Sequence, residues 1–294
     1  MPQRNRLSDK PVWPEGVGRL ALAAIDSTNA HGLRLAPTLT GPLWLLAEEQ
    51  TAGRGRRARP WVSPRGNFHG TLVLAPREAA DQVALRSFAA ALALRDGLVA
   101  LTGLPEAFAL KWPNDVLLNG GKVAGILLES VAAGAGVAHL VIGIGVNLIA
   151  APVASLLEPT ALRAVTLLAE TGLRVAPEIL LDHLAPAYAR WEAIFVTEGF
   201  APLRTEWLAN AARLGEVIRA RTGTQSREGR FETVDASGAL ILGTKQGRVA
   251  IPAAEVFFRR SRGSFTPPRT PPWSICAGMN AEREAEGISD ASGD

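Results

Sequence analysis

Arginine residues are concentrated in one short segment of the chain. It reads Gly53-Arg54-Gly55-Arg56-Arg57-Ala58-Arg59-Pro60-Trp61, and no acidic residue lies between Glu49 and Glu78. Glycine lets a backbone approach a ligand closely, and Pro60 and Pro64 disfavour a helix. Crowded guanidinium groups repel one another unless an anion joins them, and they suit phosphate oxygens well. We predict a mobile loop, called the Arg loop below, that orders around a phosphate-bearing ligand. The alternative is a solvated Arg-rich turn.

Two further segments carry lysine beside groups that can build a site. Lys111-Trp112-Pro113-Asn114-Asp115 places a cation, an aromatic ring and a carboxylate at the end of a predicted strand. Lys122 begins an apolar strand whose small residues Ala124 and Gly125 let a ligand lie against the backbone. The alternatives are a surface Lys–Asp pair and a hairpin lysine in water, with Trp112 in the core.

Polar side chains that suit a heterocycle stand at three other places. Ser27, Thr28 and Asn29 lie at a strand-to-helix junction, where helix capping alone explains their types. Gln50 enters the Arg loop and can both donate to and accept from a ureido or amide group. Asn147 ends a glycine-bearing strand and can do the same at the edge of a base. An ordinary terminal asparagine is the alternative there.

Other site classes are excluded by residue type and spacing. The Arg loop fits the loose pattern G-x-G-x-x-A, but its prolines forbid the helix that a dinucleotide site needs. Gly121-Lys122 is followed by Val123, so it is not a P-loop. The four histidines are scattered, and no triad with a nucleophile is suggested. No metal site is predicted, and catalysis is expected to rest on positioning and charge stabilisation.

Composition indicates an ordinary soluble globular protein. The chain has 294 residues, of which 47% are hydrophobic and 20% charged, with a net charge of +3. That charge is too small to suggest non-specific binding to nucleic acid. The single cysteine, Cys276, excludes an internal disulfide. Neither a membrane-spanning run nor a signal peptide is recognised, so a cytoplasmic location without a membrane partner is expected.

Strand and helix signals alternate through the first two thirds of the chain. Strands are predicted at 19–25, 43–48, 68–74, 108–112, 116–118, 122–131 and 139–148, and helices at 27–35, at 81–102 and over much of 161–210. Short strands at 216–221, 229–234, 239–242 and 248–251 suggest a small barrel. We therefore predict an extension (1–16), an α/β domain with a mixed sheet (17–211), an SH3-like β-barrel (212–260) and a disordered tail (261–294).

Together these motifs resemble the biotin protein ligases. The segments that match are Ser27–Asn29, Gln50 with the Arg loop, Lys111–Asp115, 122–127 and 143–148, in the family's order. The resemblance implies a class II synthetase-like catalytic domain, of the α+β or α/β type, followed by an SH3-like domain. It also implies two half-reactions: the biotin carboxylate attacks the α-phosphate of ATP, and a carrier-domain lysine then attacks the biotinyl-5′-adenylate. Mg²⁺ is expected with ATP.

The resemblance also implies roles for individual residues. Lys122 would contact the biotin carboxylate and the α-phosphate, with Lys111 and Asp115 supporting the phosphate and acceptor-lysine end. Arg54, Arg56 and Arg57 would close over the adenylate. Residues matched to biotin are Ser27, Thr28, Asn29, Gln50, Arg54, Gly55, Arg56 and Lys122; those matched to the nucleotide are Gly53, Arg57, Arg59 and Asn147.

The same motifs allow two alternative functions. A lipoate or octanoate ligase or transferase shares the scaffold, but its transferase members need a core cysteine, and Cys276 lies in the predicted tail. A biotin-sensing DNA-binding regulator would need a helix-turn-helix domain, whereas the motifs begin by Asp26, so a monofunctional enzyme is expected.

His69 stands where the family often has an aromatic residue. A biotin carrier domain of a carboxylase is the expected partner; whether the enzyme is a homodimer is left open.

Overall fold

A computed structural model describes residues 11–133, 136–152, 162–222, 225–252 and 255–258. They all belong to one compact unit, Met1–Arg259. The predicted tail (261–294) and most of the predicted extension (1–16) lie outside the described residues. Of the extension, Trp13 is described and packs against the core, with its indole N–H donating to the Val17 carbonyl at 2.7 Å.

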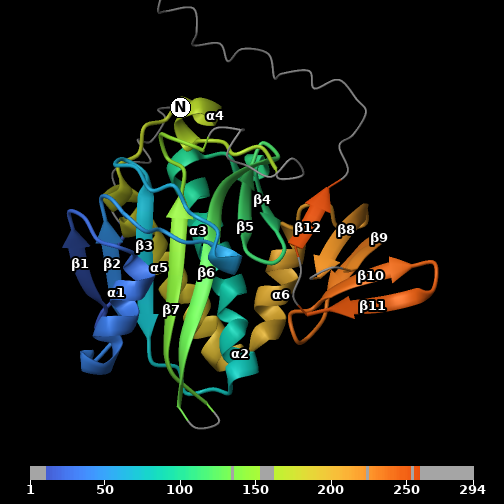
Figure 1. Cartoon of the computed structure of the whole chain (residues 1–294), viewed down its shortest axis with the longest axis horizontal. Helices are drawn as coiled ribbons and strands as arrows, with labels where there is room; N and C mark the ends of the chain where they lie inside the picture. Colours follow the sequence, from blue (N-terminus) through green and yellow to red (C-terminus); the bar gives the residue numbers. More distant parts are fainter. Residues whose placement is uncertain (1–10, 134–135, 153–161, 223–224, 253–254, 259–294) are drawn as a thin grey trace, which may run out of the picture. The chain divides into compact units, whose positions relative to one another are not determined.

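A seven-stranded mixed sheet forms the centre of the larger domain (Figure 1). Its strand order is β1-β2-β3-β7-β6-β5-β4, and only β1 and β2 run parallel to each other. The strands are β1 (Gly18–Leu22), β2 (Leu43–Ala47), β3 (Phe68–Leu74), β4 (Phe108–Lys111), β5 (Asp115–Leu118), β6 (Gly121–Ala133) and β7 (Gly136–Val146). Each corresponds to a predicted strand, which confirms the mixed sheet.

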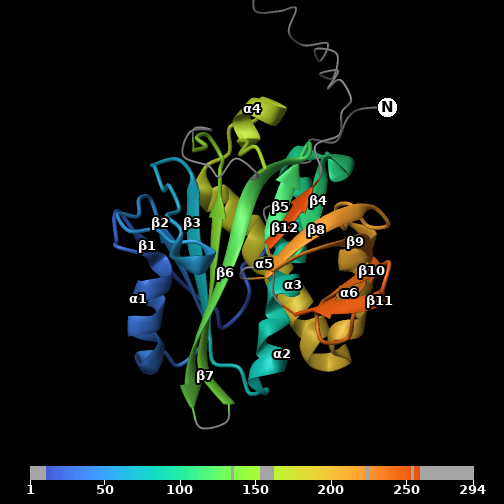
Figure 2. The same cartoon turned by 45° about the vertical axis from the view of Figure 1, so that its right-hand side comes forward.

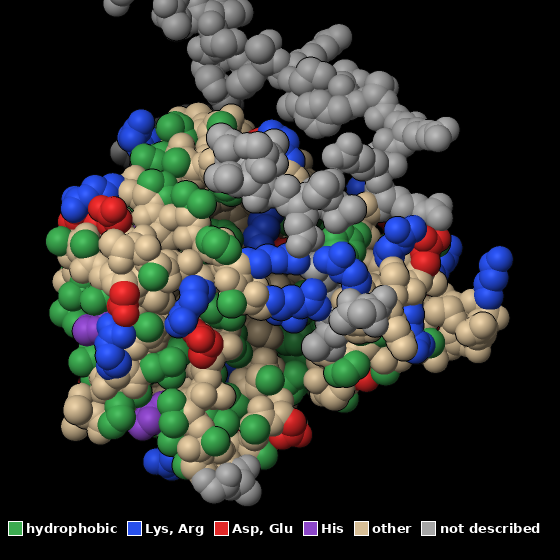
Figure 3. Space-filling view, viewed as in Figure 1, with side chains coloured by type: hydrophobic (Ala, Val, Ile, Leu, Met, Phe, Trp, Pro, Cys, Tyr) green, Lys and Arg blue, Asp and Glu red, His purple; other side chains and the backbone are tan. Residues whose placement is uncertain are grey.

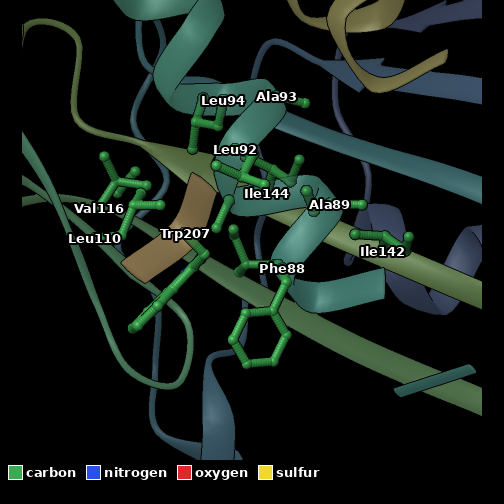
Figure 4. Packing of buried hydrophobic residues seen from close by; sticks show 14 of the residues in the cluster. Phe88, Ala89, Leu92, Ala93, Leu94, Leu110, Val116, Ile142, Ile144 and Trp207 are labelled. Atoms are coloured by element: carbon green, nitrogen blue, oxygen red, sulfur yellow. The ribbon is translucent and has the colours of Figure 1, made fainter. Parts of the chain in front are cut away.

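Helices cover both faces of this sheet (Figures 1 and 2). Neighbouring strand residues point to opposite faces, so Val141 packs beside α1 while Ile142 joins the main core. Figure 4 shows Ala89 of α3 beside Ile142 and Leu92 of α3 beside Ile144, all of them members of the main core. The helices are α1 (Thr28–Leu35), α2 (Ala80–Ala84), α3 (Arg86–Thr102), α4 (Leu167–Thr171), α5 (Pro177–Glu198) and α6 (Phe200–Ala209), with single 3₁₀ turns η1 (Ala36–Thr38) and η3 (Pro105–Ala107).

The predicted helix over 81–102 is divided in two. α2 ends at Ala84 and α3 begins at Arg86, with Leu85 between them. Val83 and Leu85 are both buried, although residues two apart point to different sides of a continuous helix. Leu85 itself keeps right-handed helical angles, φ −66° and ψ −16°, so the interruption is confined to this one residue. No helix in the described part of the chain is long and apolar enough to span a membrane.

A five-stranded antiparallel sheet forms the C-terminal domain. Its order is β11-β10-β9-β8-β12, from β8 (Val217–Thr222), β9 (Gln225–Val234), β10 (Leu240–Thr244), β11 (Gly247–Ile251) and β12 (Glu255–Phe258). The sequence predicted the first four of these strands. β12 escaped prediction because it pairs with β8 rather than with its neighbour in sequence, so no hairpin signal marks it. The small all-β domain is confirmed.

The C-terminal sheet is joined to the larger domain through Trp112. This residue is buried, as the core interpretation expected, and its indole N–H donates to the Gly238 carbonyl at 3.0 Å. The backbone of Leu110 adds hydrogen bonds to Asn210 and Ala212, just before β8. The residues on either side of Lys111 are therefore bonded to the C-terminal sheet, through Trp112, and to the segment that leads into it, through Leu110.

Candidate active site

A cavity of about 530 Å³ lies above β6 and β7 and beneath the Arg loop. Figure 3 shows Lys and Arg side chains gathered across the middle of this side of the molecule. β12 supplies part of the cavity wall through Val256 and Phe257. The residues expected in a site that also line this cavity are Ser27, Thr28, Asn29, Gln50, Arg54, Gly55, Arg56, Arg57, Arg59, Lys111, Asp115, Lys122 and Asn147.

The Arg loop is a compact hairpin rather than a helix. Arg54 and Pro60 form an antiparallel bridge, and the Gly55 N–H donates to the Arg59 carbonyl at 2.8 Å. At its tip, Arg56–Ala58 form the single 3₁₀ turn η2, with Arg57 at φ 58° in the left-handed region. The loop therefore directs several guanidinium groups toward one cavity. Its ordering by a ligand stays a prediction.

Gly53 is the one expected site residue that does not line the cavity. A Cβ at this position would lie 2.6 Å from Ser63 Oγ and 2.7 Å from the Trp61 carbonyl oxygen. The Gly53 carbonyl also accepts a hydrogen bond from the Trp61 N–H at 2.9 Å. Glycine is thus needed here because the two arms of the loop meet without room for a side chain.

Asp115 holds both lysines of the site. Its Oδ1 lies 2.7 Å from Lys122 Nζ, and its Oδ2 lies 3.1 Å from Lys111 Nζ. Burial would raise the pKa of the Asp115 carboxyl, but the two ammonium groups outweigh burial and bring this pKa to about 2. The strand ends place these residues together, since Asp115 begins β5, Lys111 ends β4 and Lys122 is the second residue of β6.

Trp61 lies on a floor made of glycine. Gly125 in β6 and Gly145 in β7 pair across the sheet, and a Cβ on Gly145 would come within 2.5 Å of the Trp61 ring. Lys122 Nζ stands 5.5 Å from the centre of the same ring. The buried Trp61 Nε1 has no hydrogen-bond partner within the described part of the chain. The cavity thus combines a flat aromatic surface with a nearby cation.

A connected set of polar groups forms the other end of the cavity. Ser27 caps α1 through a hydrogen bond from the Ala30 N–H, as the capping interpretation expected. The Thr28 N–H donates to Gln50 Oε1 at 2.8 Å, and Gln50 Nε2 donates to Ser63 Oγ at 2.9 Å. This network joins the start of α1 to the residues just before and just after the Arg loop, and it holds these side chains in fixed orientations.

Asn147 lies beside the glycine floor of Gly125 and Gly145, and its backbone fixes it there. It follows β7 directly, and its N–H donates to the Val123 carbonyl at 2.8 Å. Asn114 likewise connects two parts of the site, because its Nδ2 donates to the Ile126 carbonyl while its Oδ1 accepts from Arg56 at 3.3 Å. Both amides therefore lie where a ligand over β6 and β7 would meet them.

Sequence reasoning assigned no role to several residues around the cavity. Trp61 and Asn114 stood inside the quoted motifs, so their position was a usable signal. Phe257 lies far along the chain from every motif, and Glu129 lay inside the predicted strand 122–131 without a role. Only the folded structure brings Phe257 into the wall and Glu129 to Asn29.

The arrangement suits a reaction between two anions. Six cationic side chains line the cavity, and cations fixed around developing phosphoryl charge lower a reaction barrier. The described residues contain no cluster of three or more His, Cys, Asp or Glu side chains that could hold a metal ion. The cationic residues are Arg54, Arg56, Arg57, Arg59, Lys111 and Lys122.

Two family models match the chain. Residues 22–147 match the biotin/lipoate A/B protein ligase family, and residues 214–259 match the biotin protein ligase C-terminal domain. The first match contains the Arg loop, the lysines and Asn147. The second contains all five strands of the C-terminal sheet.

Whole relatives give the same result. The biotin–[acetyl-CoA-carboxylase] ligase of Paracoccus denitrificans is 60% identical over 81% of this chain and 99% of its own length. The bifunctional ligase/repressor BirA of Escherichia coli is 30% identical over 78% of this chain and 70% of its own length. Among solved structures, the Aquifex aeolicus biotin protein ligase in complex with biotin and ATP superimposes with a TM-score of 0.70, at 27% identity, over 83% of this chain and 99% of that one. The chain belongs to the biotin protein ligase family.

Proposed function

We propose that this protein activates biotin with ATP and transfers it to one lysine of a biotin carrier domain. The biotin carboxylate oxygen attacks the α-phosphorus, and the bond to pyrophosphate breaks, giving biotinyl-5′-adenylate. The ε-amine of the carrier lysine then attacks the acyl carbon and displaces AMP. The observation that carries this proposal is the convergence of six cationic side chains on one cavity that also has a polar network and an aromatic floor.

Charge is the main problem that the site has to solve. Carboxylate and triphosphate repel each other, and each fixed cation between them lowers that repulsion. Lys122 stands between the aromatic floor and Asp115, so we assign its ammonium group to the reacting carboxylate and the α-phosphate. Arg54 and Arg56 would close over the adenylate, with Arg57 and Arg59 toward the nucleotide. Closure would keep water from the intermediate.

We assign the polar end of the cavity to the ring of biotin. The surface formed by Trp61 over Gly125 and Gly145 is assigned to the nucleotide. Ser27, Thr28, Asn29 and Gln50 offer a set of donors and acceptors for a ureido group. Gly55, at the turn of the Arg loop, would let the backbone of the loop approach the bound biotin. Asn147 would read the edge of the adenine.

Mg²⁺ would enter this site on the triphosphate rather than on protein ligands. Both oxygens of Asp115 are taken by lysines, which leaves few carboxylate oxygens for a cation here. Mg²⁺ commonly binds to substrate phosphates with only one or two protein carboxylates. The ion would neutralise the leaving pyrophosphate, while Lys111 and Asp115 keep Lys122 in place.

A lipoate or octanoate ligase remains the second candidate, because the family that matches includes lipoate ligases. The named relatives favour biotin, and so does a cavity end rich in hydrogen-bonding groups. The carrier domain of a carboxylase is the proposed acceptor, since the Paracoccus denitrificans relative is a biotin–[acetyl-CoA-carboxylase] ligase. We expect the enzyme to act in the cytoplasm, where ATP is supplied.

The test is a transfer assay with the full-length protein. Labelled biotin, ATP with Mg²⁺ and a carboxylase carrier domain are incubated together, and label on the carrier is followed. We expect label that depends on ATP and on the acceptor lysine, and none when labelled lipoate replaces biotin. Transfer of lipoate instead of biotin would support the second candidate, and no transfer of either acid would overturn both.

A further inference from the structure

Glu129 is a carboxylate placed next to a site that is proposed to gather anions. It lies in β6, opposite Val141 of β7, two residues after Leu127 in the cavity wall. Its Oε2 accepts a hydrogen bond from Asn29 Nδ2 at 2.8 Å, and its Oε1 lies 4.0 Å from Arg54. A carboxylate here weakens the binding of an acid and a triphosphate by charge repulsion. We therefore look for its role in the contacts that it makes with Asn29 and Arg54.

The partners of Asn29 determine which way its amide faces. Nδ2 has two hydrogens, and they are directed at Glu129 Oε2 and, at 3.3 Å, at the Leu127 carbonyl oxygen. The carbonyl oxygen can only accept, and so can the ionised carboxylate. On the other side, Asn29 Oδ1 accepts from the Thr71 hydroxyl at 2.7 Å, and Thr28 Oγ1, 2.8 Å from the same hydroxyl, can donate its own hydrogen to it. The amide orientation therefore follows from its neighbours and does not depend on distinguishing N from O in the side chain.

This orientation leaves Asn29 with one kind of hydrogen-bonding capacity. Both N–H groups are bonded within the protein, and one of the two acceptor positions on Oδ1 is used by Thr71. The remaining position can only accept. Asn29 is buried and lines the cavity above Gly143, where a Cβ would come within 2.2 Å of Oδ1. A ligand ring at this end is therefore met by an acceptor and must offer an N–H.

We propose that Glu129 is a positioning residue that fixes the Asn29 amide with its oxygen toward the substrate, so that the site selects a ring N–H. This inference rests on the proposed function, and it gives a physical reason for the preference between acids. The ureido ring of biotin has two N–H groups, whereas the dithiolane of lipoate and the chain of octanoate have none. A buried acceptor left without its donor costs binding free energy, so those acids are rejected.

Glutamine and alanine at position 129 separate hydrogen bonding from charge. In the Glu129→Gln variant the side-chain oxygen can still accept from Asn29, while the charge near Arg54 is lost. In the Glu129→Ala variant both contacts are lost, and Asn29 can turn its N–H groups toward the cavity. Glu232→Gln is the matched control, because Glu232 pairs with Arg248 at 2.6 Å on the C-terminal sheet. Thermal unfolding confirms that each variant folds.

The probes are biotin and its two cyclic carbamate analogues, in each of which a ring oxygen replaces one ureido N–H. Isothermal titration of the full-length protein gives the three dissociation constants. For the wild type and Glu232→Gln we expect biotin to bind at least about tenfold more tightly than one carbamate, the value of one lost hydrogen bond. Glu129→Gln should keep this ratio within about twofold, and Glu129→Ala should lower it at least about fivefold, because a turned amide can donate to the ring oxygen.

The other outcomes contradict the inference in distinct ways. If Glu129→Ala weakens biotin and the carbamates equally, Glu129 has a structural role only. If Glu129→Gln loses the preference as Glu129→Ala does, the charge beside Arg54 sets the preference and the amide does not. If the wild type binds lipoate and not biotin, the proposed function itself is wrong, a result that no variant at position 129 would produce.

Discussion

The ammonium group of Lys122 lies 2.7 Å from Oδ1 of Asp115. The second oxygen of the same carboxylate holds Lys111, so one buried acid fixes two cations that come from different strands. Without this acid, the buried Lys111 ammonium would lack a counter-charge and would repel the partly exposed ammonium of Lys122. Asp115 therefore determines where the positive charge of the site lies before any ligand enters.

Replacing Asp115 with asparagine tests this relationship through stability. Breaking a buried ion pair at one partner costs about 3–5 kcal/mol, so we expect Asp115→Asn to lower the free energy of unfolding by that order. The pKa of Asp115 is about 2 in the folded protein, below its value of 3.8 when unperturbed. The stabilisation is therefore present above 3.8 and lost as the pH falls toward 2.

Urea unfolding at several pH values checks both parts of this expectation. The difference between wild type and variant should be constant from about pH 7 to about pH 5 and should shrink below about pH 4. A difference that grows on acidification would contradict the assigned pairing. Glu232→Gln, on the C-terminal sheet, gives the size of an exposed pair, which is about 1 kcal/mol or less.

The cationic residues themselves should matter for chemistry more than for folding. We expect Lys122→Ala and Arg56→Ala to lower biotin-dependent pyrophosphate release by about two orders of magnitude or more, as is usual when a group that stabilises transition-state charge is removed. Arg248→Ala on the C-terminal sheet is the control for loss of a surface arginine. Near-normal release in both site variants would contradict the roles proposed for them.

The glycine floor predicts a sharp difference between two alanine substitutions on one strand. A Cβ at Gly145 would come within 2.5 Å of the Trp61 ring, whereas a Cβ at Gly136 has its nearest neighbour at 3.7 Å. We expect Gly145→Ala to displace Trp61 and to raise the KM for ATP at least about tenfold. A loss of about 1.4 kcal/mol of binding free energy is enough to produce a tenfold change. Steady-state kinetics check this, and Gly136→Ala should behave as the wild type.

The sequence predicted the elements of the site better than its connections. All seven strands of the larger sheet were recognisable because apolar runs and turn signals are local. The sequence located the strand ends that carry Lys111, Asp115 and Lys122. It did not show that these three side chains contact one another, because spacing along the chain does not determine which strands pair. Glu129 and Phe257 were missed because their partners come from other elements. Gly53 does not line the cavity, because a Cβ there would meet Ser63 and Trp61, and its assignment to the nucleotide stays a prediction.

His69 gives a prediction with a defined pH window. This residue is buried in β3, burial lowers the pKa of its imidazole below 6.5, and Nε2 lies 3.1 Å from the Pro64 carbonyl oxygen. Folding therefore favours the neutral ring, so the stability that His69 contributes is present above about 6.5 and is lost as the pH falls below it.

A phenylalanine at this position keeps an aromatic ring and removes the titration. We expect the free energy of unfolding of wild type, relative to His69→Phe, to decrease between about pH 7.5 and about pH 5.5. Chemical denaturation of both proteins at the two pH values measures it, and other groups cancel in the comparison. An increase on acidification would mean that the buried ring is charged.

β12 gives the cavity a wall from the far end of the described chain. During synthesis the Arg loop leaves the ribosome long before Val256 and Phe257 do, so the growing polypeptide has its cations exposed while that wall is still missing. The cavity should therefore be complete only after the C-terminal sheet has been made and has folded against the larger domain. A reactive acyl-adenylate would then be made only by molecules that can shield it and deliver it.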